Sequence, residues 1–379
     1  MKITLHKVGL AGMTAGLLSL AVVCTITRIG QTGVIGSLDE IAAQTVLPSG
    51  NYKYQAAAAP SPEVSELQNS AAEKPGEQSR AVSQTSGVSE IDFQYYEPAQ
   101  SELDRYDADH EGEEQYPVLE FTSVQGNEAF GGVQVKNISS AEIDIEEELQ
   151  GRLGFSIEKN NEPQVLIYHT HTSESFLPYD TGYYYESFYP RSSNNSENVC
   201  AVGEEITKVL EKNGIRTIHD TTVHDASYTD AYDKSYDTVT DYLEKYPSIK
   251  VLLDIHRDGI GSESSRSKPV CTIDGKKAAQ FMILAGYNYD DDPGFTDWEY
   301  NLRFALNIQK KASVMFPDLA RPVDFGDFTY HMDLTPGSLL IEVGSDSNSI
   351  TEVRYTGYLL GTVLAETLNE HISQDTERQ

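Results

Sequence analysis

The sequence predicts an α/β protein with a single three-layer domain, in which a mostly parallel sheet is covered by helices. Short apolar stretches at 165–168, 250–256 and 339–343 are typical of strands that are buried on both faces. Helix-length segments with one apolar face separate these stretches, and this alternation favours a parallel sheet. Each stretch also delivers a His or a Glu at or near its end, where α/β enzymes place functional side chains.

The helices are predicted from apolar periodicity and from signals at their ends. In residues 197–213 the apolar side chains share one face, and Gly214 ends the helix. The last helix begins with a capping box, Ser349-Ile-Thr-Glu352, and runs to about residue 372. The other predicted elements are helices at 228–246 and 295–316, strands at 215–218 and 280–286, and loops at 176–190, 259–268 and 322–336.

Residues 1–28 are predicted to be an N-terminal membrane anchor. Basic residues precede residues 8–26, nineteen positions without a charge, which is long enough to span a bilayer as a helix. The basic residues favour a cytoplasmic N terminus and an exported remainder, so the expected location is a single-pass protein of the cell membrane with an extracytoplasmic domain. A cleaved signal peptide is the alternative, but Arg28-Ile-Gly-Gln lacks a clear cleavage pattern.

Residues 29–120 are predicted to be an acidic, disordered linker. Within them, residues 61–120 carry fifteen Asp or Glu against three Lys or Arg. Such a segment buries too little apolar surface to offset the entropy of ordering it. Residues 121–160 are expected to form a small N-terminal elaboration, with a strand at 133–136 and a short helix at 143–153, and residues 161–379 the catalytic domain.

The net charge of −31 excludes nucleic acid as a partner, because phosphate binding needs a basic surface. The chain has three cysteines, of which Cys24 lies in the apolar N-terminal segment. Cys200 and Cys271 lie in apolar-patterned stretches and are expected to be buried free thiols, with a disulfide between them as the alternative.

Four side chains at the strand ends predict a zinc site that activates water. Such a site needs three protein ligands, an open fourth position and a carboxylate that takes the proton of the water. His171, Glu174 and His256 are predicted to be the ligands and Glu342 the base. A charge inside the apolar 339–343 strand is costly unless it is paired or linked to a metal, which favours a functional role for Glu342.

Four further residues are candidates for supporting roles. Glu197 is the alternative third ligand, although an acid in the first turn of a helix also has a simple helix-dipole explanation. Asp254 shares a strand face with His256 and is expected to orient a ligating imidazole. His169 is expected to be a hydrogen-bonded or buried histidine beside the ligands, and His331 is a candidate to stabilise an oxyanion.

At these residues the chain resembles the stage II sporulation protein P family of endospore-forming bacteria. The segments that carry the resemblance are Tyr168-His-Thr-His-Thr-Ser-Glu-Ser-Phe-Leu-Pro, Asn198-Val-Cys-Ala-Val-Gly, Leu253-Asp-Ile-His-Arg-Asp and Leu339-Leu-Ile-Glu-Val-Gly-Ser-Asp-Ser-Asn. The family resembles zinc N-acetylmuramoyl-L-alanine amidases, and this implies roles for His171, His256 and Glu342, with Asn348 completing the last motif. Those amidases take their middle Glu ligand from just before the first long helix, about fourteen residues after the His, and neither Glu186 nor Glu197 combines that spacing with that position.

The first hypothesis is therefore a membrane-anchored, zinc-dependent peptidoglycan hydrolase that cuts the amide between N-acetylmuramic acid and L-alanine. The resemblance implies a second activity against peptide cross-links, a role in forespore engulfment at the engulfing membrane, and two partners, the lytic transglycosylase stage II sporulation protein D and the membrane protein stage II sporulation protein M. One alternative is a zinc carboxypeptidase acting on cell-wall peptides, which also uses a His-x-x-Glu pair and would hold the terminal carboxylate with Arg257 or Arg321. The other is a non-catalytic wall-binding protein.

Overall fold

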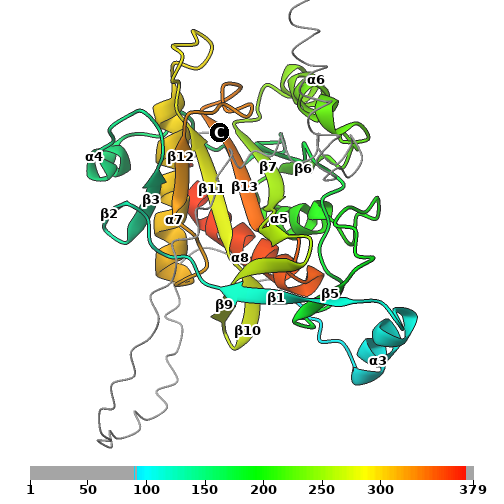
Figure 1. Cartoon of the computed structure of the whole chain (residues 1–379). Helices are drawn as coiled ribbons and strands as arrows, with labels where there is room; N and C mark the ends of the chain where they lie inside the picture. The colour runs from blue at the N-terminus through cyan, green and yellow to red at the C-terminus, as the bar shows by residue number, and fades with distance from the viewer. Residues whose placement is uncertain (1–88, 90–91, 373–379) are drawn as a thin grey trace, which may run out of the picture. The chain divides into compact units, whose positions relative to one another are not determined.

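The computed structural model describes residue 89 and residues 92–372. An eight-stranded sheet with helices on both faces dominates this part of the chain (Figure 1), and the predicted α/β class is confirmed. The strands in spatial order are β2 (Glu128–Phe130), β3 (Val133–Asn137), β12 (Val323–Gly326), β11 (Phe281–Gly286), β13 (Gly337–Ser345), β7 (Val251–Asp258), β4 (Val165–Tyr168) and β6 (Thr217–His219).

Apart from the edge strand β2, which pairs antiparallel with β3, the sheet consists of two parallel halves that run in opposite directions. Strands β13, β7, β4 and β6 are parallel to one another, and so are β11, β12 and β3. The halves meet where β11 pairs antiparallel with β13. The prediction of a mostly parallel sheet therefore holds within each half. Because β4, β7 and β13 are neighbours in the same half, their carboxyl ends lie at one edge of the sheet.

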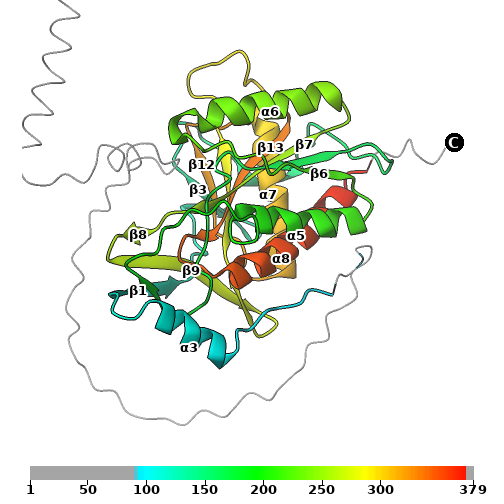
Figure 2. The same cartoon turned by 90° about the vertical axis from the view of Figure 1, so that its right-hand side faces the viewer.

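Helices cover both faces of this sheet (Figure 2). Ile167, Leu253 and Ile341 pack in a core with residues of α5 (Val199–Lys212), α7 (Trp298–Met315) and α8 (Ile350–Asn369). Leu166 and Leu252 point to the opposite face, where they pack with Val239 of α6 (Ala231–Lys245). This alternation along each strand explains why the sequence shows unbroken apolar runs.

The helix ends follow local hydrogen bonding. Ser349 accepts from the backbone N–H of Glu352, and the Glu352 side chain accepts from the backbone N–H of Ser349, so the predicted capping box is present at the start of α8. The predicted helix 228–246 begins as a 3-10 turn, η1 (Tyr228–Asp230), before α6. The predicted helix at 143–153 is shorter, because α4 (Ile145–Gln150) is capped by Asp144 and ends at Gly151.

A second, five-stranded sheet lies outside the predicted architecture. The path runs β10 (Lys276–Ala279), β9 (Ser265–Ile273), β1 (Gln115–Phe121) and β5 (Tyr183–Tyr185), and β8 (Gly261–Ser262) pairs with β9. Three loop predictions are wrong, since 176–190 contains β5 and 259–268 contains β8 and the start of β9, all in this sheet, and 322–336 contains β12 of the main sheet. These strands are short or carry polar residues on their exposed side, so they lack the apolar run that identifies a buried strand.

The predicted linker extends too far toward the C terminus. Residues 92–120 include α3 (Gln100–Asp109) and β1, which pairs parallel with β9 and antiparallel with β5. Phe93 stacks on Tyr358 of α8, with ring centroids 5.3 Å apart. The acidic composition did not predict that this segment is ordered. Its order comes from backbone pairing with strands far along the chain, which composition does not report.

The region 121–160 is also more than an elaboration, because β3 pairs with β12 inside the main sheet. Residues 1–88 lie outside the described residues, and with them the predicted anchor and most of the predicted linker. Among the helices of the described part of the chain, none is long and apolar enough to cross a membrane. Cys200 and Cys271 are free and buried, as predicted.

Candidate active site at the carboxyl edge of the sheet

His171 lies just after β4, where the chain turns across the edge of the sheet. Its side chain is buried, and the ring stacks on Tyr228 of η1 at a centroid distance of 4.5 Å. The His256 ring meets it edge-on at 5.4 Å. Burial lowers the pKa of His171 to about 4, so the ring is neutral at physiological pH. Its Nδ1 atom is buried without a hydrogen-bond partner and is therefore available as a ligand.

His256, at the end of β7, is held between two carboxylates. Its Nε2 atom lies 2.9 Å from Asp254 Oδ1 and its Nδ1 atom 3.4 Å from Glu174 Oε2, although the Nε2 contact lacks the angle of a hydrogen bond. Burial alone would lower the pKa of His256, but Asp254 and then Glu174 outweigh burial and raise it well above 6.5. The site therefore favours a positive charge at this ring, which is a proton in the absence of a metal.

Asp254 is fixed by Thr170, which donates from its backbone N–H (2.8 Å) and from its hydroxyl (2.6 Å). The strand position i, i+2 puts Asp254 on the same face of β7 as His256. The structure thus has the carboxylate–histidine contact expected from the sequence, and Asp254 orients the ring from a rigid strand.

Glu174 is brought to His256 by the turn that follows His171. Its backbone N–H donates to the His171 carbonyl, and its Oε2 atom accepts from the backbone N–H of Arg257. Burial would raise the pKa of Glu174, but the Arg257 and His256 charges hold it well below its usual range. Glu174 is therefore ionised at neutral pH, as a metal ligand must be.

Glu342 on β13 lies directly opposite His256 in the strand register. Its Oε2 atom is buried without a hydrogen-bond partner, and burial, followed by the Asp258 charge, raises the pKa of Glu342 to about 8. A buried carboxyl that is left unpaired needs a functional explanation.

The turn after Glu342 is built by Gly344 and Asn348. Gly344 has φ +67°, and a Cβ atom there would lie 2.6 Å from Asn348 Oδ1, which accepts from the Ser345 backbone N–H. Asn348 Nδ2 donates to Glu352 Oε2 at 3.1 Å, which links this turn to the cap of α8. These contacts give Gly344 and Asn348 a positioning role, and they explain why both belong to the motif around Glu342.

Two predicted candidates do not contact this group. Glu197 is exposed and accepts from Ser192 and Asn194, so it braces a surface loop instead of binding a ligand at the sheet edge. His331 has φ +59° and places Nε2 3.1 Å from both the Ser235 hydroxyl and the Tyr232 carbonyl, where its ring is already engaged. Both positions were assigned from local sequence alone, which does not report the direction of a side chain.

Tyr232 and Arg191 also lie at the site, and no motif in the sequence marks either residue. The Tyr232 ring meets His171 at 5.8 Å, and its hydroxyl oxygen is buried without a hydrogen-bond partner. Arg191 pairs with Asp225 at 2.7 Å, and its guanidinium lies over the Tyr228 ring. The helical spacing of Tyr232 fits a core contact equally well, so its sequence position does not distinguish the two roles.

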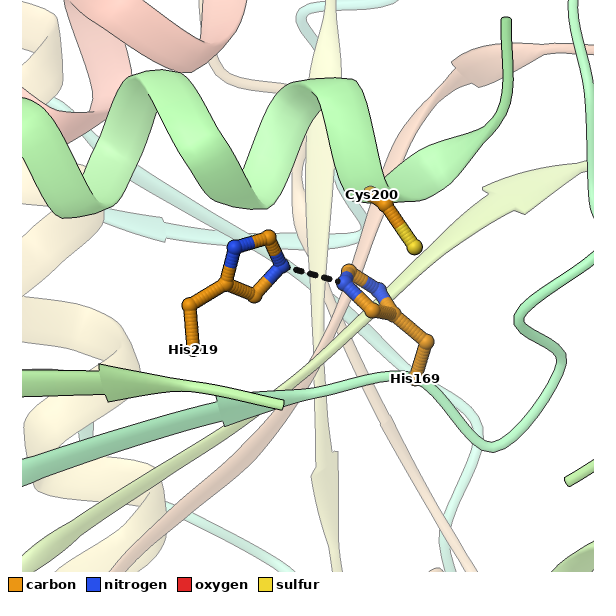
Figure 3. A group of neighbouring side chains, drawn as sticks. All are labelled: His169, Cys200 and His219. Atoms are coloured by element: carbon orange, nitrogen blue, oxygen red, sulfur yellow. Dashed lines mark hydrogen bonds between the residues drawn. The ribbon is translucent and has the colours of Figure 1, made fainter. Parts of the chain in front are cut away.

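His169 lies on the opposite face of β4 from His171. Its Nδ1 atom lies 2.9 Å from the Ile255 carbonyl, and its Nε2 atom lies 2.9 Å from His219 Nε2, with Cys200 close by (Figure 3). Burial lowers the pKa of His169 to about 3 and also lowers that of His219. His169 is therefore buried and hydrogen-bonded, as expected, but it belongs to a different cluster from the predicted ligands.

Among the described residues, two groups bring their potential ligand atoms within 4.8 Å of one another. They are His169, Cys200 and His219, and Glu120, Asp180 and Glu352. The second group is neutralised by Lys268 and Lys277, which form ion pairs with it. The predicted ligands are in neither group, so His171, Glu174 and His256 must draw closer together to share one ion. The donor atoms of these residues are of types that zinc binds. His171 is a neutral imidazole whose Nδ1 atom has no hydrogen-bond partner, Glu174 is an ionised carboxylate, and the surroundings of the His256 ring favour positive charge.

This α/β domain brings two imidazoles and two buried carboxyls together at the ends of parallel strands. It therefore belongs to the class of α/β proteins that have a candidate metal site at the edge of the sheet. The chain itself belongs to the stage II sporulation protein P (SpoIIP) family, whose profile matches residues 49–365. The Stage II sporulation protein P of Bacillus subtilis (strain 168) is 30% identical over 217 residues. That match spans 53% of this chain and half the length of the relative. The family resemblance predicted from the motifs is thereby confirmed.

Solved amidase structures are similar to parts of the chain. The N-acetylmuramoyl-L-alanine amidase AmiC2 of Nostoc punctiforme is 11% identical with a TM-score of 0.32, over 57% of this chain and 98% of that one. The N-acetylmuramoyl-L-alanine amidase from Clostridium difficile 630 is 12% identical with a TM-score of 0.34, over 58% of this chain and 100% of that one.

Proposed function

We propose that this protein is a zinc-dependent peptidoglycan hydrolase that cuts the amide between N-acetylmuramic acid and L-alanine. Family membership supports the assignment, and one observation carries it: Glu342 is buried with an unpartnered carboxyl oxygen, directly opposite His256 in the strand register. This arrangement places a potential general base, Glu342, beside a site that attracts positive charge.

In this proposal His171, Glu174 and His256 hold the zinc ion. When bound, zinc lowers the pKa of water and polarises the carbonyl of the scissile amide. Asp254 keeps the His256 ring oriented, since it contacts the ring and is itself held by Thr170. The Glu174 carboxylate contributes negative charge that remains at every working pH, because its pKa is held well below the usual range.

Glu342 moves the proton. It accepts a proton from the attacking water as the oxygen adds to the amide carbon, and it delivers that proton to the nitrogen of L-alanine as the carbon–nitrogen bond breaks. The products are a free carboxyl on muramic acid and a free amine on the stem peptide. A pKa of about 8 before metal binding suits a group that must both accept and release a proton near neutral pH.

Tyr232 takes the oxyanion-stabilising role that the sequence suggested for His331. Its hydroxyl is buried and unpartnered beside His171, whereas the His331 ring is engaged with Ser235 and the Tyr232 carbonyl. A hydroxyl that lacks a ground-state partner is available to donate to a developing negative charge.

The carboxypeptidase alternative is less well supported, because neither arginine is free for a terminal carboxylate. Arg257 is buried and donates to the carbonyls of Ser175 and Pro190. Arg321 pairs with Asp258 at 2.9 Å.

Digestion of purified peptidoglycan by the full chain, followed by mass spectrometry of the products, tests the proposal. Each digest is run after chelation and again after zinc is added back. Free stem peptides that begin with L-alanine, and that appear only with metal, are the expected result. Shortened stems still attached to muramic acid would favour the carboxypeptidase, and no metal-dependent product would favour a wall-binding protein.

The cellular setting is a separate proposal that rests on the family and on the N-terminal sequence. We expect residues 1–28 to anchor the protein, the domain to lie outside the cytoplasm, and the protein to act during engulfment with stage II sporulation proteins D and M. Protease accessibility of the domain in intact protoplasts tests the orientation. Co-purification with each partner from sporulating cells tests the assembly, and protection from protease would contradict the anchored, extracytoplasmic arrangement.

A further inference from the structure

A second cluster of metal donors lies on the face of the sheet that α5 covers, opposite the candidate active site. We propose that His169, Cys200 and His219 bind a transition-metal ion of the Zn²⁺ class. The three donors come from the end of β4, the first turn of α5 and the end of β6, and their ligand atoms lie within 4.8 Å of one another. Two imidazoles and a thiolate are a donor set that zinc favours.

In the metal-free protein, one imidazole of the pair must donate an Nε2 proton to the Nε2 lone pair of the other. The Nδ1 atom of His169 faces the Ile255 carbonyl, an acceptor, so it carries the proton and Nε2 presents a lone pair. On His219, Nδ1 faces the Glu204 carboxylate, 3.8 Å away, which also favours a proton on Nδ1. The two Nε2 atoms then turn lone pairs toward each other across 2.9 Å.

A metal-free pair can resolve this conflict only by placing a proton between the two Nε2 atoms. His219 must then either lose its Nδ1 proton, and with it the interaction with Glu204, or carry a second proton in a largely buried place. A divalent cation accepts both lone pairs at once and keeps both outer interactions. Histidine ligands of metals usually donate their other N–H to a carbonyl or a carboxylate, which is the arrangement that Ile255 and Glu204 provide.

Gly203 makes room for this pair. A Cβ atom at Gly203 would lie 2.5 Å from His219 Nε2 and 3.1 Å from His169 Nε2, so even a methyl group would enter the space between the nitrogens and α5. Figure 3 shows the two rings facing each other below the helix, with the Cys200 side chain directed from the helix toward the ring of His169. A glycine in a helix costs about 1 kcal/mol relative to alanine, so its presence at this point needs a local reason.

The spacing of the donors is close to that of a tetrahedral site. Bond lengths of zinc to nitrogen and to sulfur place neighbouring ligand atoms roughly 3.3–3.6 Å apart. The two Nε2 atoms, at 2.9 Å, need to open slightly, and the sulfur needs to approach only if it lies near the 4.8 Å limit. The His219 side chain is 8% exposed, so the cluster is not completely closed off from solvent.

Such a site would tie the edge strand β6 and the start of α5 to β4, two residues before His171. It therefore has a structural role that is independent of the proposed hydrolysis. It differs chemically from the candidate active site in one respect that an experiment can use, because it alone contains sulfur.

Cobalt substitution of the full chain tests the proposal. The protein is stripped with a chelator under reducing conditions and titrated with Co²⁺, while the near-ultraviolet charge-transfer absorption of a thiolate–Co²⁺ bond is followed. The wild type should gain this band, and Cys200→Ser should lose it, whereas Cys271→Ser, which alters the other described buried free cysteine, should keep it. His219→Ala and Gly203→Ala should weaken the Co²⁺ affinity of the band at least about tenfold.

Metal content gives a second readout, since Cys200→Ser should hold one equivalent of zinc less than the wild type. Circular dichroism establishes that each variant is folded. Absence of the band from the wild type at excess Co²⁺, or its persistence in Cys200→Ser, would overturn the proposal and leave a hydrogen-bonded histidine pair. Because neither readout uses peptidoglycan, the result stands whether or not the chain hydrolyses it.

Discussion

His169 and His171, which both follow β4, have opposite surroundings on the two sides of the sheet. On the α6 face, His171 stacks on tyrosine, and buried carboxyls surround its neighbour His256. On the α5 face, His169 is bonded at both ring nitrogens and lies against a helix, and the Glu204 carboxylate lies 3.8 Å from Nδ1 of its partner His219.

The arrangement on the α6 face suits catalysis, whereas the arrangement on the α5 face suits a rigid structural role. The α6 face keeps unpartnered atoms, Nδ1 of His171 and Oε2 of Glu342, which a stable interior would normally satisfy. On the α5 face no ring atom of His169 or His219 is buried without a partner, and the contacts of His169 connect β4 to its neighbours. Function is thus to be sought where polar groups lack partners, even though both histidines belong to the same His-Thr-His motif.

The largest expected effect comes from Glu342→Gln, which keeps the shape of the side chain and removes the base. Hydrolysis of peptidoglycan should fall by about a hundred- to ten-thousand-fold, the range for a general base. The unfolding midpoint should be unchanged or higher, because an unpaired buried acid is lost. Glu197→Gln is the matched control and should retain activity. Full activity of Glu342→Gln, or loss of zinc from Glu197→Gln, would reverse the roles assigned to these two acids.

The same variant reveals the pH dependence of stability on the α6 face. In the metal-free protein the pKa of Glu342 is about 8, above its unfolded value near 4.5, so the folded state holds a proton that the unfolded state releases. The contribution of Glu342 is therefore fully present below pH 4.5 and is lost as pH rises through about 8, by an amount on the order of a few kcal/mol. Denaturant unfolding of chelated wild type and Glu342→Gln should show stabilities that diverge between these limits, in favour of the variant. Parallel curves would show that Glu342 titrates normally.

Asp254→Asn weakens the orientation of His256 without removing a ligand. Zinc affinity should fall by about 10- to 100-fold, as expected for the loss of a carboxylate that supports a metal-bound histidine. Competition with a chromogenic chelator measures this affinity, and excess zinc should restore much of the hydrolysis. An unchanged zinc affinity would mean that Asp254 acts only by accepting hydrogen bonds from Thr170 and so holding the turn.

The smallest expected effect lies on the α5 face. Gly203→Ala should improve helix propensity by about 1 kcal/mol, yet the added methyl group meets the His219 ring at 2.5 Å. We expect a net loss of about 1–3 kcal/mol in the free energy of unfolding, typical of overpacking. The double variant Gly203→Ala/His219→Ala should recover part of this loss, as a double-mutant cycle would show. A gain in stability for Gly203→Ala alone would mean that the ring moves freely.

Prediction succeeded where local pattern and tertiary position agree. The strand at 165–168 was predicted with the bounds of β4, and the capping box of α8 was predicted to the residue. His171, Glu174, His256 and Glu342 were selected because polar side chains at the ends of apolar strands stand out, and the fold brings them to one sheet edge.

Prediction failed where order depends on partners far away in the chain. β1 pairs with β9, so Val118 lies opposite Arg266, and neither segment carries the apolar run of a buried strand. The reversal of the sheet at β11 has the same origin, because the apolar run that predicts a strand is identical for either strand direction.

The sequence by itself determined the α/β class, the family and the side chains from which a metal site can be built, because strand periodicity and motif spacing are local properties. Only the tertiary structure decided that His169 and His171 belong to different sites, since the chain leaves the strand after Tyr168 and turns at residues 170–173, so that two side chains two positions apart no longer share a face. It also decided that Glu197 stays at the surface and that Tyr232 joins the site. The direction of a side chain depends on the packing of whole elements, which no local pattern contains.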